Sequence, residues 1–174
     1  MSTSIPEADI TLRDGRSVRV RAMEPADEPE LLQAFSRMSE DARYMRFMRV
    51  VREPNLERLR KVLASFPEGG IGIVATVPAE DGVDIVGSAI AIVVNRTTCE
   101  FAISVASAFG GAGLASALMR VLINAAAARG LTEMEGFVLA ENQPMLRLAR
   151  RLGFSVVPDP EDRAVRICRL ALGG

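Results

Sequence analysis

Hydrophobic residues recur along this chain with two spacings, one typical of strands and one typical of helices. Runs rich in Val, Ile and Phe predict buried or half-buried strands. These runs cover residues 17–21, 70–77, 85–95, 97–106, 133–139 and 163–170. Asp14-Gly15 predicts the turn of a hairpin that begins at Ile10. A further short strand is expected from Phe154, ahead of a turn at residues 158–160.

Apolar residues at helical spacing predict the other elements. Positions 114, 118, 121, 122 and 125 share one helix face, and Gly130 stands where that helix should end. Acidic residues after Pro25 suit the first turn of another helix. Five helical segments are expected, and they begin at Pro25, Ser39, Asn55, Leu114 and Asn142. The segment from Ser39 should break near Glu53-Pro54.

These segments predict one αβ domain over residues 1–174, a length typical of a single domain with a sizeable core. In condensed form, with the hairpin written as one β, the expected order of elements is β-α-α-β-β-β-α-β-α-β-β. We see no internal repeat, linker or low-complexity segment.

Composition narrows the class of protein. A hydrophobic fraction of 49% and a formal net charge of −1 argue against disorder and against a generally basic nucleic-acid binder. No run approaches the roughly 18 apolar residues of a membrane span. The start of the chain lacks the basic and apolar regions of a secretion signal. We therefore expect a cytoplasmic protein whose partners are neither nucleic acid nor membrane.

The sequence contains no histidine. This excludes Ser-His-Asp and Cys-His catalysis, His-ligated zinc and a histidine base, and no metal site is expected. Cys99 and Cys168 each fall inside a predicted strand and are expected to be buried free thiols. Proton transfer is left to carboxylates, Tyr44, Lys61, a cysteine or water.

The most informative stretch is the glycine-rich turn at Phe109–Ser116, which joins an apolar strand to a helix. Glycine lets the backbone approach a ligand, and the first N–H groups of a helix attract anions. The turn lacks the Gly-Lys-Ser/Thr of a Walker A loop and the full glycine pattern of a dinucleotide fingerprint. Glycine here would also serve tight packing alone, but a phosphate or pyrophosphate fits the turn.

At this turn the chain resembles the GNAT acetyltransferase superfamily, whose Q/R-x-x-G-x-G/A motif binds the pyrophosphate of acetyl-CoA. Gly113 and Ala115 match the motif, whereas Gly110 stands where the family has Gln or Arg. Backbone N–H groups are then the main phosphate ligands. Downstream, Asn142 opens a helix that ends in Leu152-Gly153-Phe154, which is similar to the second GNAT motif.

The segments Ser39–Phe47 and Glu100–Ala102 are similar to the acetyltransferase domain of bacterial Pat-type protein lysine acetyltransferases. The resemblance, which spans about Ile10 to Leu172, implies a mixed, mostly antiparallel twisted sheet flanked by helices. It also implies acetyl-CoA as co-substrate, with pantetheine held between parted strand ends near Val105 and Leu139. The residues it implies for acetyl-CoA are Ile103, Ser104, Val105, Gly110, Gly111, Ala112, Gly113, Leu114, Ala115, Ser116, Asn142 and Met145.

Glu100 is the candidate general base. Acetyl transfer needs a neutral amine, and a free lysine has a pKa of about 10.4, so a carboxylate must take the proton directly or through water. By strand alternation Glu100 shares a face with Ala102 and Ser104. Position alone fits an exposed strand end equally well, and the Pat-type resemblance favours catalysis. Ala149 stands where many GNAT enzymes have a tyrosine general acid, so no acid is assigned.

Arg43, Arg46, Arg49 and Arg52 recur at every third residue and are expected to form a basic stripe along a helix. A solvated face is the simpler interpretation. The functional one is contact with an acidic acceptor surface or with the 3′-phosphate of CoA, and Arg43, Arg46 and Tyr44 are the candidate acceptor contacts.

The favoured reaction is direct transfer of acetyl to a protein lysine ε-amine, without a covalent enzyme intermediate. A small-amine acceptor and a weakly catalytic acyl-CoA sensor remain alternatives. A monomer or homodimer is expected.

Overall fold

Eight strands and five helices make up the part of the chain that the computed structural model describes, residues 5–173. The strands are β1 (Ala8–Thr11), β2 (Ser17–Ala22), β3 (Gly70–Ala79), β4 (Gly82–Val93), β5 (Thr98–Val105), β6 (Glu133–Leu139), β7 (Ser155–Asp159) and β8 (Asp162–Ala171). The helices are α1 (Glu28–Arg37), α2 (Glu40–Phe47), α3 (Leu56–Ser65), α4 (Leu114–Ala128) and α5 (Gln143–Arg151). Single 3₁₀ turns at Pro25–Asp27 and Ser107–Phe109 precede α1 and the glycine-rich turn.

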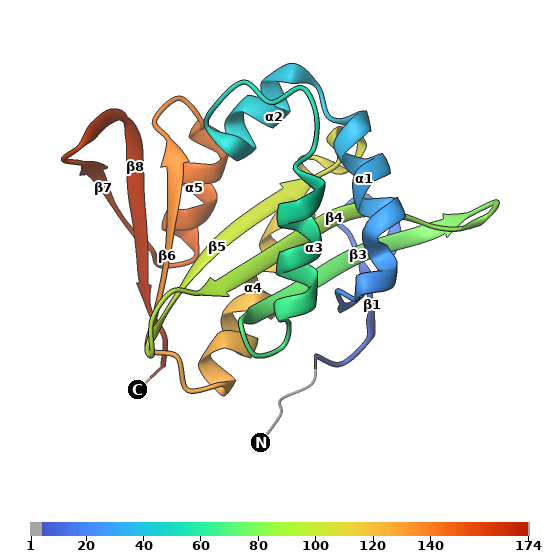
Figure 1. The fold of residues 1–174 in the computed structure, drawn as a ribbon, viewed down its shortest axis with the longest axis horizontal. Coiled ribbons are helices and arrows are strands. Elements are labelled where there is room, and N and C mark those ends of the chain that lie inside the picture. Colours follow the sequence, from blue (N-terminus) through green and yellow to red (C-terminus); the bar gives the residue numbers. More distant parts are fainter. Residues whose placement is uncertain (1–4, 174) are drawn as a thin grey trace.

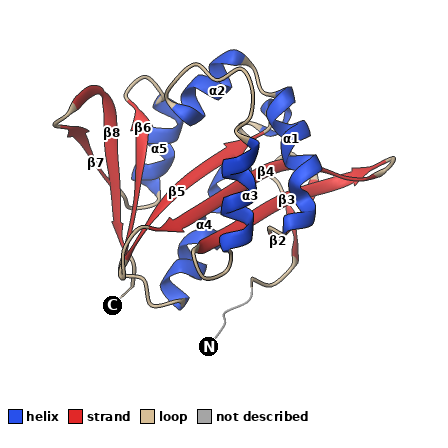
Figure 2. Cartoon of the chain, in the orientation of Figure 1, coloured by secondary structure: helices blue, strands red, loops and turns tan. Residues whose placement is uncertain are grey.

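All eight strands belong to one sheet in the order β1-β2-β3-β4-β5-β6-β8-β7 (Figure 2). Neighbouring strands are antiparallel except β5 and β6, which are parallel. The expected mixed, mostly antiparallel sheet is therefore confirmed. The β5–β6 connection runs through α4, as a parallel pair requires.

Helices cover both faces of this sheet. In Figure 1, α1 and α3 lie in front of β3 and β4, while α4 lies behind them. The larger core is on the α4 side, where fully buried Leu118, Met119 and Leu122 pack against the strands. A smaller core under α1 and α3 contains Leu63 and Val74. The site described below forms where α2, α4 and α5 approach the end of β5.

Helix starts follow the sequence prediction closely. The side chains of Ser39, Asn55 and Asn142 each accept a hydrogen bond from the backbone N–H three residues later, so all three cap their helices. Gly130 has a φ of 87°, which suits the residue that follows a helix C-terminus.

One expectation about the N-terminal half is wrong. The hairpin contributes two strands and the chain around Pro54 contributes two helices, as the segments predicted, so the full order is β-β-α-α-α-β-β-β-α-β-α-β-β, one strand and one helix more than the condensed order. Helix α2, however, ends at Phe47, where Met48 turns left-handed with a φ of 59°. Arg49 and Arg52 therefore lie in a loop, and the four arginines form no helical stripe.

The reason for this early end lies in Arg43. Its guanidinium donates hydrogen bonds to the carbonyl oxygens of Phe35, at 3.1 Å, and Arg52, at 3.2 Å. These bonds fold the loop back against α2 and tie both to the end of α1. The recurrence of arginine at every third residue could not reveal these contacts of Arg43 with backbone carbonyls.

The two cysteines are buried free thiols, as predicted. Burial raises the pKa of Cys99 to about 11 and also raises that of Cys168, so both stay protonated at neutral pH. Within residues 5–173 we find neither a helix able to cross a membrane nor a cluster of three potential metal ligands. The secretion-signal prediction concerns Met1–Ser4 in part, and these four lie outside the described residues.

Candidate active site

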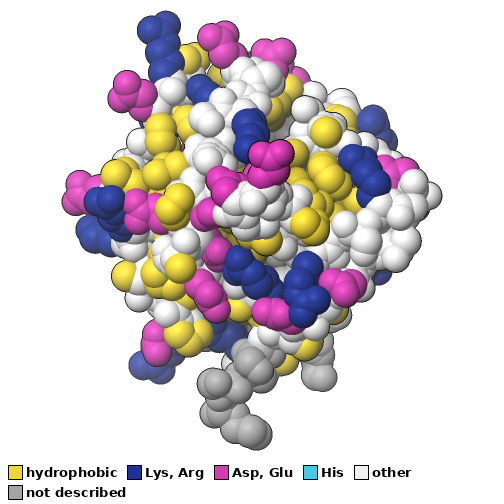
Figure 3. Space-filling view, turned by 90° about the vertical axis from the view of Figure 1, so that its right-hand side faces the viewer, with side chains coloured by type: hydrophobic (Ala, Val, Ile, Leu, Met, Phe, Trp, Pro, Cys, Tyr) yellow, Lys and Arg dark blue, Asp and Glu magenta, His cyan; other side chains and the backbone are white. Residues whose placement is uncertain are grey.

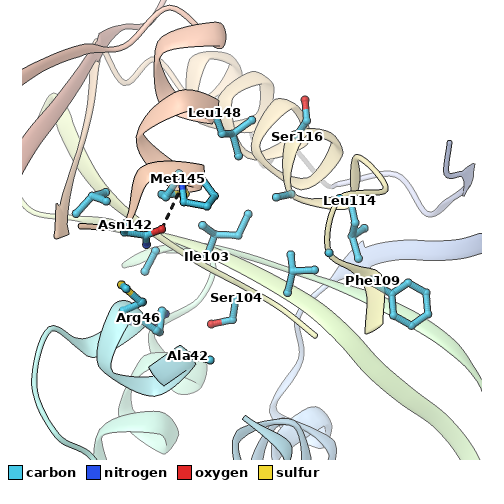
Figure 4. Close-up of a pocket in the computed structure, with 18 of the residues that line it drawn as sticks. Ala42, Arg46, Ile103, Ser104, Phe109, Leu114, Ser116, Asn142, Met145 and Leu148 are labelled. Carbon is cyan, nitrogen blue, oxygen red and sulfur yellow. Dashed lines mark hydrogen bonds between the residues drawn. The ribbon is translucent and has the colours of Figure 1, made fainter. Parts of the chain in front are cut away.

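Strands β5 and β6 part after a short paired stretch. They pair only from Thr98–Glu100 to Glu133–Glu135, and beyond that point a cavity of about 670 Å³ opens between them. Figure 4 shows its walls: Ile103 and Ser104 on β5, Asn142 and Met145 at the start of α5, and Leu114 and Ser116 at the start of α4.

The first residues past the pairing pack closely against one another. The ring of Phe101 lies against the backbone of Gly136 and leaves no room for a Cβ atom there. The same ring packs on Phe154, with ring centroids 5.3 Å apart. The Phe101 ring thus fills the space above Gly136, directly after the last pair between the two strands.

The glycine-rich turn forms one end of this cavity. Gly111 and Gly113 have φ values of 73° and 90°, which side chains rarely adopt, and α4 starts directly after them. No hydrogen-bond acceptor for the backbone N–H groups of residues 111–116 is found within residues 5–173. These donors lie at the N-terminus of a 15-residue helix, which is the arrangement that binds phosphate.

Eleven of the twelve residues proposed to bind acetyl-CoA line the cavity. They are Ile103, Ser104, Val105, Gly110, Gly111, Gly113, Leu114, Ala115, Ser116, Asn142 and Met145. The side chain of the twelfth, Ala112, is buried in the core instead. Asn142 uses its side-chain oxygen to cap α5, at 3.4 Å from the N–H of Met145.

Arg13 is a site residue that the sequence did not indicate. It lies in the β1–β2 turn, and its guanidinium donates a hydrogen bond to the carbonyl of Gly111 at 2.9 Å. Its backbone N–H reaches the carbonyl of Ala112 at 3.1 Å. A cation from a remote hairpin thus stands beside the turn in which Gly110 replaces the family's Gln or Arg. The contact joins residues 98 positions apart, so no local pattern could have predicted it.

The charged residues that line the cavity are all arginines. Arg13, Arg46, Arg120 and Arg151 contribute to its walls, and no Asp or Glu does so. None of the four forms an ion pair within the described residues. Such a cavity favours a ligand with several negative charges.

A second cavity, of about 1080 Å³, adjoins the first along β5. Helices α1, α2 and α3 and strands β4 and β5 surround it, and apolar side chains such as Phe35, Leu59 and Ile90 supply much of its wall. Glu100, Ala102 and Ser104 all line it, as do Phe101 and Val105 of the same strand.

Glu100 is half-buried in this second cavity. Burial, and secondly the neighbouring Glu135, raise the pKa of its carboxyl above the ordinary 4.5, while Arg58 and Arg46 act in the opposite direction. A raised pKa makes the carboxylate a stronger base, as proton abstraction from an ammonium requires.

The three candidate acceptor contacts have different places. Arg46 lines both cavities. Arg43 lines neither, and its hydrogen bonds to backbone carbonyls serve the fold. Tyr44 is 37% exposed and also lines neither cavity. Ala149 is fully buried in the core, so its position offers no proton donor to the site.

Comparison with known proteins agrees with this geometry. Residues 17–155 match the family model of the acetyltransferase (GNAT) domain. An acetyltransferase of Pseudomonas aeruginosa is 32% identical over 163 residues, which cover 93% of this chain and 88% of that protein.

Two solved structures share the fold. The GNAT domain of PAT from S. lividans has a TM-score of 0.86 at 22% identity, covering 95% of this chain and 97% of that one. A phosphinothricin acetyltransferase of the GNAT superfamily from Sinorhizobium meliloti, solved with acetyl-CoA, has a TM-score of 0.69 at 19% identity and covers 90% and 89%. With the family model and the Pseudomonas relative, the conclusion is that this chain belongs to the GNAT family and is an acetyltransferase.

Proposed function

We propose that this enzyme transfers acetyl from acetyl-CoA directly to a primary amine, and that its acceptor is the ε-amine of a protein lysine. The observation that carries the proposal is the meeting of two cavities at β5. The cavity with the glycine-rich turn, here called the donor cavity, and the cavity with Glu100, the acceptor cavity, share a set of lining residues. Those residues are Met38, Ala42, Arg46, Phe101, Ala102, Ser104, Val105 and Phe137.

The donor cavity suits acetyl-CoA along its length. The free N–H groups of residues 111–116, with Arg13 beside them, fit the pyrophosphate. The unpaired edge of β5 past Glu100 fits the amide groups of pantetheine. The thioester would then reach the shared wall of the two cavities.

Glu100 would take the proton of the attacking amine, directly or through a water molecule. It lines the acceptor cavity, and the pKa shift described above favours proton uptake. The amine nitrogen forms the new bond to the acetyl carbon as the bond from that carbon to sulfur breaks.

A covalent acetyl-enzyme is not needed for this reaction. Cys99 and Cys168 line neither cavity, and burial keeps both protonated. Their reduced state also suits the cytoplasmic location proposed from the sequence.

A lysine on a protein fits the acceptor cavity better than a compact polar amine does. Apolar walls suit the methylene chain of lysine. Met48 lines the cavity and is 37% exposed, and nearby Val50 is 74% exposed, so apolar surface continues outside the cavity for a polypeptide to cover. The fold shared with a phosphinothricin acetyltransferase keeps a small amine as the second candidate.

An acceptor screen with labelled acetyl-CoA tests the proposal. Proteins and lysine peptides form one arm, and polyamines, amino acids and aminoglycosides form the other, with release of free thiol measured in parallel. We expect label on protein lysines and none on lysine-free control proteins. Efficient labelling of a small amine alone would overturn the choice of acceptor. Thiol release that no acceptor stimulates would overturn amine transfer itself.

A further inference from the structure

One charged side chain lines both cavities. Of the residues that the donor and acceptor cavities share, only Arg46 is ionisable. It comes from α2, which packs against β5 and β6 where they part. Figure 4 shows Arg46 on the opposite side of the cavity from Met145 and Leu148, with Ile103 and Ser104 between them. In direct transfer, this junction is where the thioester meets the amine.

The Arg46 guanidinium has no partner within residues 5–173. No hydrogen bond or ion pair involves its side chain, although it is partly buried. Its one specific contact is with the ring of Phe47, 4.6 Å from the guanidinium carbon to the ring centroid. Burial and the nearby Arg58 lower the pKa of Arg46 to about 10, so it is still charged at neutral pH.

The reaction creates negative charge at this junction, and among the described residues Arg46 is the one cation that lines both cavities. The carbonyl oxygen gains charge when the amine attacks, and sulfur gains it when the carbon–sulfur bond breaks. Ala149 cannot protonate the sulfur, and Tyr44 does not reach either cavity. Ser104 lines both cavities, but a neutral hydroxyl stabilises an anion less than a guanidinium does.

We propose that Arg46 is a catalytic residue whose guanidinium contacts the thioester and stabilises the departing CoA thiolate. The inference rests on the proposed function. The amine nitrogen bonds to the acetyl carbon, the carbon–sulfur bond breaks with its electron pair going to sulfur, and the amine proton goes to Glu100. CoA then leaves as a thiolate paired with Arg46, so no general acid is required.

The first test measures the thiol of bound CoA, without any acceptor. Ultraviolet absorbance of the thiolate, titrated against pH with desulfo-CoA as the blank, gives the thiol pKa in the complex. In the wild type we expect that pKa to lie below the value of free CoA, because a nearby cation favours the anion. Arg46→Gln should remove the lowering, and Arg46→Lys should retain part of it.

The second test measures turnover. Removing one preorganised donor to a developing anion typically lowers kcat by about 10²–10³, and we expect this range for Arg46→Gln, with little change in the KM for acetyl-CoA. Arg46→Lys should recover part of kcat.

Arg58→Gln is the matched control. Arg58 lines only the acceptor cavity, and it acts on Glu100 as Arg46 does. The charged groups that act on Glu100 are Glu135 on β6, Arg58 on α3 and Arg46 on α2. Removing either arginine should therefore move the acidic limb of the pH–rate profile upward. Only the Arg46 variant should change the titration of bound CoA.

The outcomes separate the inference from the proposed function. Bound CoA with an unshifted thiol pKa in the wild type would overturn the role of Arg46 alone. So would an Arg46→Gln variant that keeps kcat and loses only affinity for the acceptor. A wild type that does not bind CoA at all would overturn the proposed function as well. The wild-type titration remains decisive even where a variant fails to fold.

Discussion

At the scale of single residues, the site combines the half-buried Glu100 with several arginines that form no ion pair within residues 5–173. Glu100 lies between Glu135, which raises its pKa, and Arg46 and Arg58, which lower it, and burial decides the direction of the net shift. This setting makes the proton affinity of Glu100 higher than that of an exposed glutamate, as a base for an ammonium group requires.

Replacing Glu100 with Gln tests the base. We expect turnover to fall by about 10²–10⁴ while acetyl-CoA still binds, because the amide cannot accept the proton. The acidic limb of the pH–rate profile should disappear as well. In the wild type that limb should lie above pH 4.5, the ordinary pKa of a glutamate, since the carboxyl must be ionised to act. Steady-state kinetics and calorimetry measure the two effects, and near-full activity at pH 7 would make Glu100 a strand-end charge only.

The same variant should gain stability at neutral pH. A carboxyl whose pKa is higher in the folded than in the unfolded protein contributes stability at low pH and loses it as pH rises through the folded pKa. Glu100→Gln removes this loss of stability, because the amide does not ionise. Its thermal midpoint should exceed that of the wild type at pH 7 and converge with it in acid. A midpoint below the wild type at pH 7 would contradict the burial argument.

Arg13 is expected to supply the phosphate contact that the family's Gln or Arg makes and that Gly110 cannot make. We predict that Arg13→Gln weakens CoA binding by about 10–100-fold, the effect of losing one hydrogen bond to a charged group. The loss should be equal for CoA and 3′-dephospho-CoA, because Arg13 lies beside the pyrophosphate turn. Calorimetry measures both affinities. Arg19→Gln is the control, since Arg19 lies in the same hairpin but pairs with Glu7 and Asp9. Equal losses of CoA affinity in the two variants would mean that Arg13 acts only through the overall positive charge of the hairpin.

At the scale of elements, the site depends on where a strand pair stops. β5 and β6 share three residue pairs and then part, and α4 and α5 close the opening from one side while α2 closes it from the other. The unpaired edge of β5 then remains available to a ligand. Directly after the last pair, the Phe101 ring lies against Gly136 and fills the space above the glycine backbone.

Gly136→Ala should therefore destabilise the enzyme. The added Cβ would collide with the Phe101 ring, and overpacking of this kind costs about 1–3 kcal/mol. Chemical denaturation measures the free energy of unfolding. The double variant Gly136→Ala with Phe101→Leu should recover part of the loss, because leucine lacks the ring edge that meets the new methyl. A single variant as stable as the wild type would show that the ring moves freely away from the new methyl group.

At the scale of the whole molecule, positive and negative charges nearly balance, but almost all the positive charges belong to arginine. Lysine occurs once, at Lys61, against 20 arginines. On the side of the molecule that carries the β3–β4 hairpin, positive and negative side chains are interspersed (Figure 3). Arginine supplies the positive charge without offering an acceptor amine, because it stays protonated.

We predict that the enzyme does not acetylate itself efficiently. Lys61 is far from Glu100 in sequence, yet α3 borders the acceptor cavity through Arg58, Leu59 and Val62, and Lys61 itself does not line it. Mass spectrometry after incubation with acetyl-CoA should find no stoichiometric modification at Lys61. The variant Arg58→Lys, which places an amine in the cavity, is the positive control. Glu100-dependent acetylation of Lys61 would contradict the prediction. The N-terminal amine lies outside the described residues.

The sequence by itself determined the elements and one half of the site. Apolar periodicity and the capping residues Ser39, Asn55 and Asn142 predicted most helices and strands, because these signals act within a few residues. The glycine-rich turn predicted the donor cavity for the same reason. Strand alternation predicted that Glu100 shares a face with Ala102 and Ser104, and all three line the acceptor cavity.

Only the tertiary structure decided which distant residues contact these locally predicted elements. The end of α2 depends on Arg43 reaching the carbonyls of Phe35 and Arg52, and the cation beside the pyrophosphate turn comes from the distant Arg13. The place of Arg46 at the junction of both cavities depends on how α2 packs over the parted strands. Each of these contacts joins segments whose separation in space is set by the packing of the sheet and its helices, and no local pattern in the chain encodes that separation.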